Sequence, residues 1–162
     1  MRSAAICSTL LPRGGAAANI WRKAAMPNTW RRVGRMARAV TIEGTRTAEA
    51  LVDEFLGLWE RHRPVLRVVD LATAEGDLRF QNIRTHLLNE VTLGLRDVIQ
   101  EFRSSNKHDV EPMAQAATLV SMLAHVAQHR YGFEFWGIRL DDIRKSLARI
   151  LYSGLTGKPP AR

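Results

Sequence analysis

An unbroken apolar stripe in the middle of the chain is the feature that most constrains its fold. From Asp77, which can cap a helix, large apolar side chains recur every three or four residues to about Arg103. This spacing places them on one face of an α-helix, which would be roughly 39 Å long at a rise of 1.5 Å per residue. The stripe consists of Phe80, Ile83, Leu87, Val91, Leu95, Val98 and Phe102. We therefore predict one long helix at the centre of the chain.

Two shorter segments precede this helix. A first amphipathic helix is predicted to start at Thr47 and to end or kink near His62, because Pro64 interrupts the hydrogen-bond ladder. The apolar residues from Val65 to Leu71 are too dense for a surface helix. They predict a short buried segment, closed by Gly76, that packs beneath the longer helices.

Two further helices follow a polar turn at residues 104–107. Asp109 is expected to cap the first of them, with Glu111 and Pro112 in its opening turn. An aromatic cluster bracketed by Gly132 and Gly137 then links it to a last helix, which is predicted from about Leu140. Glycines and prolines from residue 154 onward stop that helix. No segment requires a strand, so we expect an all-α helical bundle.

The net positive charge of the chain comes from its N-terminal end. Residues 2–38 hold eight basic residues and no acid, whereas residues 43–162 hold sixteen of each sign. This split predicts a basic leader over residues 1–42, a helical domain over 45–155 and a flexible tail over 156–162. A short amphipathic helix is predicted at 29–41. It places Arg31, Arg35 and Arg38 on one face, for a weak contact with DNA phosphates or an anionic membrane. A poorly ordered extension is the alternative.

Other residue types exclude several classes of protein. Cys7 is the only cysteine, so no disulfide can form within the chain, and we expect a reduced, cytoplasmic protein. Charged residues or histidines interrupt every apolar run before it could span a bilayer. His125 and His129 stand at a two-ligand metal spacing without a local third ligand, so neither a metal nor a cofactor is predicted. No catalytic motif is present, and an enzyme is not expected.

Three motifs in order resemble the C-terminal domain of TetR/AcrR-type transcriptional regulators. The first is the segment FLGLWERHRPVL at residues 55–66, and the second is DLRF at 77–80, which opens the long helix. The third is DVEPMAQAATLVSM at residues 109–122. The resemblance extends from Thr47 to Gly154.

The resemblance implies a domain that senses a small hydrophobic effector and forms a homodimer. Its last two long helices, Met113–Gln128 and Leu140–Tyr152, would form a four-helix interface with a second copy. The interface residues so implied are Ala116, Val120, Leu123, Ala127, Ile143, Leu147 and Ile150. The remaining helices would enclose an apolar effector pocket. Its implied lining is Phe55, Trp59, Phe80, Leu87, Val91 and Met122, although each of these could instead fill the core.

The family's N-terminal helix-turn-helix has no counterpart in residues 1–42. That motif needs a Thr-led helix, a Gly-Val turn and a Tyr-rich recognition segment, and none of these is found there. We therefore expect a truncated TetR-like repressor that binds operator DNA only if a helix-turn-helix is supplied. The alternative is a small helical interaction protein whose basic arm binds membrane or nucleic acid nonspecifically.

Overall fold

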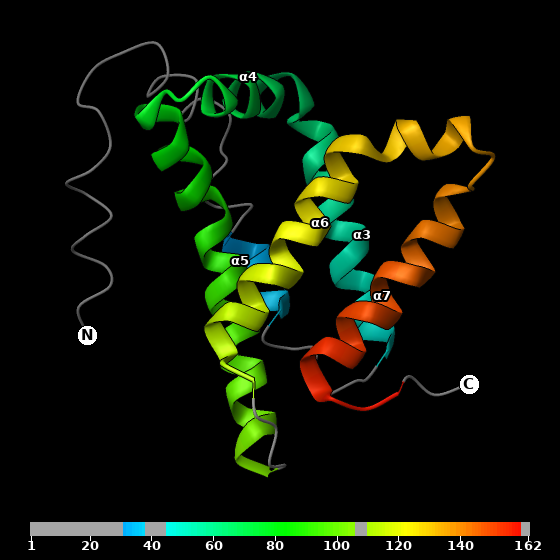
Figure 1. Cartoon of the computed structure of the whole chain (residues 1–162). Helices are drawn as coiled ribbons and strands as arrows, with labels where there is room; N and C mark the ends of the chain where they lie inside the picture. The colour runs from blue at the N-terminus through cyan, green and yellow to red at the C-terminus, as the bar shows by residue number, and fades with distance from the viewer. Residues whose placement is uncertain (1–30, 38–44, 106–109, 160–162) are drawn as a thin grey trace.

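The computed structural model describes residues 31–37, 45–105 and 110–159, and every regular element in this part of the chain is an α-helix (Figure 1). The labelled helices are α3 (Thr45–Arg61), α4 (Arg63–Ala74), α5 (Leu78–Ser105), α6 (Pro112–Phe135) and α7 (Leu140–Thr156). Residues 31–37 are helical as well. The prediction of an all-α bundle is confirmed.

The helices enclose one hydrophobic core. α6 packs against α5, α3 and α7, and α3 also packs against α7, while α4 lies across one end of α5 (Figure 1). Large side chains from four of these helices are fully buried in the core: Leu51, Phe55, Leu58, Leu87, Leu95, Leu123 and Leu151. The long apolar stripe predicted from the sequence thus faces the other helices.

The junction of α3 and α4 lies at His62, as predicted. Pro64 occupies the first turn of α4, where its missing N–H costs no helical hydrogen bond. The environment of α4, however, differs from the prediction of a buried segment. Leu66 and Val69 are buried, whereas Val68 and Leu71 are 56% and 63% exposed. α4 is therefore an amphipathic helix that covers the end of the bundle and leaves apolar side chains on its outer face.

The ends of the long helices are set by side-chain caps. The carboxylate of Asp77 accepts a hydrogen bond from the backbone N–H of Arg79 at 2.9 Å and so caps α5, as predicted. The cap of α6 is Glu111, whose carboxylate accepts from the N–H groups of Met113 and Ala114. The expected cap Asp109 lies outside the described residues. α6 also continues through Gly132 to Phe135, so the aromatic linker is shorter than predicted.

Residues 31–37 pack into the domain, although charge alone would place them in an unpacked leader. Val33 and Ala37 are fully buried. A Cβ added at Gly34 would lie 2.7 Å from the carbonyl oxygen of Glu90, so this segment touches the backbone of α5. Arg32 adds a 3.7 Å ion pair to Glu54 of α3. The packed domain therefore begins before residue 42.

Candidate functional site

Two adjoining cavities lie between α4 and the C-terminal half of α6. The larger has a volume of about 780 Å³ and the smaller of about 410 Å³, and both are lined by Arg63, Gln128 and His129. We call them together the α4–α6 groove. The rest of its lining is Trp59, Pro64, Arg67, Val68, Asp70, Leu71 and Ala74 in the larger cavity, and His125, Tyr131, Gly132, Phe133 and Trp136 in the smaller one.

The apolar wall of the groove comes from α4 and from the end of α3. α4 turns Leu66 and Val69 into the core, and this leaves Val68 and Leu71 on the other side, facing the larger cavity. Trp59 reaches this cavity from α3, although it is almost entirely buried and stacks on Phe55 with ring centroids 6.0 Å apart. The groove therefore offers a mostly apolar surface directly outside the core.

Formal charge in the groove is mainly positive. Arg63 and Arg67 stand one helical turn apart on α4, and no described carboxylate lies within ion-pair distance of either guanidinium. Asp70 is the one acid in the lining, and its Oδ1 accepts a 3.0 Å hydrogen bond from Nε of Arg84 on α5. The other oxygen of Asp70 is buried and has no hydrogen-bond partner among the described residues. The charge that the groove presents to a ligand is therefore that of the two arginines.

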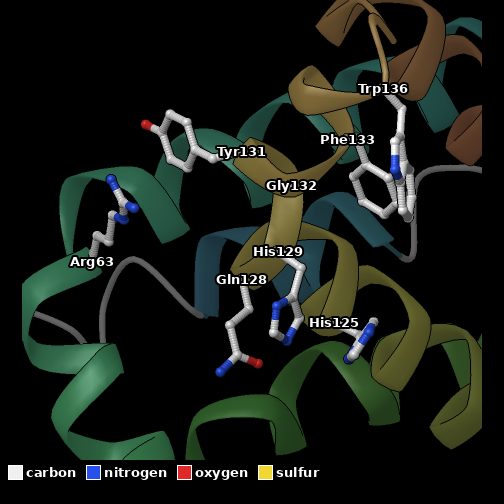
Figure 2. A pocket seen from close by; sticks show the side chains of 8 residues that line it. All are labelled: Arg63, His125, Gln128, His129, Tyr131, Gly132, Phe133 and Trp136. Carbon is white, nitrogen blue, oxygen red and sulfur yellow. The ribbon is translucent and has the colours of Figure 1, made fainter.

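Arg63 is held in place by an aromatic ring. Its guanidinium lies over the ring of Tyr131, 4.2 Å from the centroid, in a cation–π contact. The hydroxyl of Tyr131 donates to Glu60 at 2.9 Å and accepts from Arg130 at 2.7 Å. Figure 2 shows Arg63 and Tyr131 on one side of the smaller cavity, with Gln128 and His129 beneath them. These contacts connect the start of α4 to the C-terminal half of α6.

The six residues of the implied effector pocket lie in or against the core. Phe55, Leu87 and Val91 are buried, and Phe80 and Met122 are partly buried against them. Trp59 alone of the six also lines the α4–α6 groove. The sequence pattern did not single out Arg63, Arg67, Val68 or Leu71 as site residues. The helical periodicity of α4 could have indicated them. Leu66 and Val69 alone suffice for a buried face, so the other apolar residues of α4 are left for its outer side.

The implied interface residues are also found mainly in the core of the single chain. The buried ones are Ala116, Val120, Leu123, Ala127, Ile143 and Leu147. Ile150 differs from them, because it is 50% exposed on α7. Side chains that are already covered within one chain have little surface for a second copy. Dimerisation through α6 and α7 stays a prediction, and it would use the outer faces of these helices.

The outer face of α6 carries no formal charge along most of its length. No Asp, Glu, Lys or Arg occurs between Pro112 and His129, and the exposed residues there are mostly small or polar. They are Met113, Ala114, Ala117, Thr118, Ser121, His125 and His129. Beyond this stretch Phe135 and Trp136 are 89% and 71% exposed. We call the seven exposed residues the α6 face.

Two other residue sets from the sequence can be located in the described part of the chain. The rings of His125 and His129 lie 4.4 Å apart, and no group of three or more His, Cys, Asp or Glu side chains that could hold a metal is found among the described residues. Arg31 and Arg35 are exposed, and Arg38 lies outside the described residues. None of the helices in the described ranges is long and apolar enough to cross a membrane.

Comparison with known proteins identifies one family. Residues 35–162 match the family model described as "Tetracyclin repressor-like, C-terminal domain". The match includes all five labelled helices and therefore both walls of the α4–α6 groove and the α6 face. No curated protein and no solved structure matches the chain.

Proposed function

The chain belongs to the tetracyclin repressor-like family as a C-terminal domain of that family, and from this premise we propose that it is the effector-sensing and dimerising part of a transcriptional regulator. The described domain offers two adjoining surfaces for these tasks, which share His125 and His129. The α4–α6 groove would bind the effector, and the α6 face would bind a second copy. Family membership supports a regulatory rather than a catalytic role.

The absence of formal charge on the α6 face carries the dimer proposal. Exposed helix faces of soluble proteins are usually rich in charged residues, and α5 and α7 follow this rule with Arg79, Glu101, Asp142, Lys145 and Arg149 exposed. α6 departs from it over the stretch from Pro112 to His129. Interface cores are depleted in charged residues, and small side chains allow two helices to approach closely.

A two-fold axis near the middle of α6 would bring this face against its own copy. Such a pairing is self-complementary, as the commonest homodimer interfaces are. Ile150 on the exposed side of α7, together with Phe135 and Trp136 at the end of α6, would add apolar area at the margins. A closed dimer would thus cover much of the exposed apolar surface of these two helices.

The effector proposal depends on the groove. It is a concave site with a mostly apolar lining and a few polar groups, which is the usual composition of a small-molecule site. It also joins elements that pack on different parts of the bundle, because α4 contacts α5 while Tyr131 belongs to α6. A ligand in the groove would therefore touch both α4 and the helix that we assign to the dimer.

The proposal is tested by the mass of the protein in solution. Light scattering across a dilution series of the full chain should give twice the monomer mass of 18.2 kDa at micromolar concentration. The dimer should persist in high salt, because the α6 face has no formal charges to screen. A monomer at every concentration would refute the dimerising role.

A further inference from the structure

The polar groups of the α4–α6 groove are positioned for an anion. Arg63 is the first residue of α4, where the helix dipole adds partial positive charge, and Arg67 lies one turn further along on the same side. Within the described ranges neither guanidinium has a carboxylate partner. Arginine pairs well with carboxylates and phosphates because its planar fork can donate two parallel hydrogen bonds. A ligand's acid group would supply this missing partner.

The remaining lining fits an apolar body rather than a second charge. Beyond Arg67, the groove is lined by Val68, Leu71 and Ala74, which follow α4 for roughly 10 Å at 1.5 Å per residue. Val68 and Leu71 are more than half exposed, so a ligand that covers them gains hydrophobic free energy. Asp70 is already paired with Arg84, which reduces its repulsion of an anion.

We propose that the α4–α6 groove binds a small amphipathic acid, whose carboxylate or phosphate contacts Arg63 and Arg67 and whose apolar body lies along Val68 and Leu71. The proposal rests on the proposed effector-sensing function and names the chemical class of the effector. A cationic amphiphile of the same size is rejected by the two guanidinium groups. A neutral one loses the charge-assisted hydrogen bonds and binds more weakly.

Calorimetric titration of the full chain with three matched probes tests the charge preference. The probes are decanoate, its methyl ester and decyltrimethylammonium, with the two ionic probes kept below their micelle concentrations and the ester kept below its solubility limit. Decanoate should bind about tenfold or more tightly than the ester, because charge-assisted hydrogen bonds exceed neutral ones, and the ammonium should not bind measurably. Equal binding of the acid and the ester, or no binding of any probe, would overturn the proposal.

Exposed residues provide variants that should still fold. Arg67→Gln should weaken decanoate binding by about tenfold and leave the ester unchanged, because it removes one cation only. Leu71→Gln should weaken both probes, because it removes apolar contact from each. Arg149→Gln is the control, since it removes the same charge from an exposed position on α7 outside the groove. Equal losses in R67Q and R149Q would mean that only the net charge matters.

Two further measurements distinguish binding of a free acid from binding to a membrane, and failure of this inference from failure of the proposed function. Titration with phosphatidylglycerol vesicles distinguishes a free acid from a membrane surface, because vesicle binding that R67Q abolishes would assign Arg67 to a membrane surface and contradict the proposal of a free acid. Light scattering of the same samples reports the dimer independently. A dimer that shows no preference for the acid refutes the effector class alone, whereas a monomer refutes the proposed function.

Discussion

At the scale of single residues, two glycines set how closely residues 31–37 approach α5. A Cβ added at Gly94 would lie 2.6 Å from the carbonyl oxygen of Gly34 and 3.1 Å from the Cβ of Ala37. Real Cβ atoms do not tolerate backbone contacts so short, so an alanine there must push the two segments apart. The sequence alone does not reveal this contact, because helical periodicity says nothing about which distant glycines meet.

Gly94→Ala should therefore lower the free energy of unfolding by about 1–2 kcal/mol, because the core at Val33 and Ala37 must open to admit a methyl group. Gly132→Ala is the matched control. Gly132 is also inside a helix, but it has open space around its Cβ position. Alanine there should therefore raise the free energy of unfolding by about 0.5–1 kcal/mol. Urea denaturation of both variants measures the difference, and a G94A variant as stable as G132A would disprove the close contact.

At the scale of elements, His62 at the α3–α4 junction makes the free energy of unfolding depend on pH. Burial of the ring, and secondarily the charge of Arg61, lower the pKa of His62 below its usual 6.5. Between that lowered pKa and about 6.5, the unfolded chain binds more protons than the folded chain, so the free energy of unfolding rises with pH across this window. Acidification should therefore destabilise the protein.

His62→Gln should reduce this loss of stability. Urea midpoints for the wild type and H62Q at about pH 7.5 and about pH 5.5 give the comparison, and the decrease on acidification should be smaller in H62Q because glutamine does not titrate. If the two proteins lose equal stability, protonation of His62 is not coupled to folding. A larger decrease in H62Q would mean that the sign of the coupling is reversed.

The helices that follow strong local signals could be predicted from the sequence. α5 and α7 begin where Asp77 and Leu140 indicate, because caps and apolar periodicity are local properties. The exposed side of α4 could not be predicted in this way, because a dense run of apolar residues does not by itself show which of them are buried. In fact the end of a small bundle exposes part of any helix that covers it, and Val68 and Leu71 fall on the exposed part.

At the scale of the whole molecule, the family and its architecture could be predicted, but the surfaces could not. Apolar residues of α6 such as Val120 and Leu123 fit either a core or an interface, and only the packing of α3 and α5 against them shows that they fill the core. The α4–α6 groove depends on the angle between two helices, which a pattern along one helix does not contain. Its arginines were therefore not recognised.

The α6 face is the surface that we propose to join two copies of this chain. Two threonines allow a matched test, because Thr118 and Thr85 are both exposed and both donate a hydrogen bond to the carbonyl oxygen four residues earlier, at 2.9 and 3.0 Å. Thr118 lies on the α6 face and Thr85 lies on α5. Arginine at either position adds the same charge and bulk to the surface of a helix.

The most direct measurement is the molar mass of Thr118→Arg and Thr85→Arg by light scattering at one micromolar-range concentration. T118R should be a monomer, because two copies of the new charge would meet across the two-fold axis in a desolvated interface, whereas T85R should remain a dimer. Circular dichroism would show whether both variants keep the helical fold. A folded T118R with the same dimeric mass as T85R would contradict the claim.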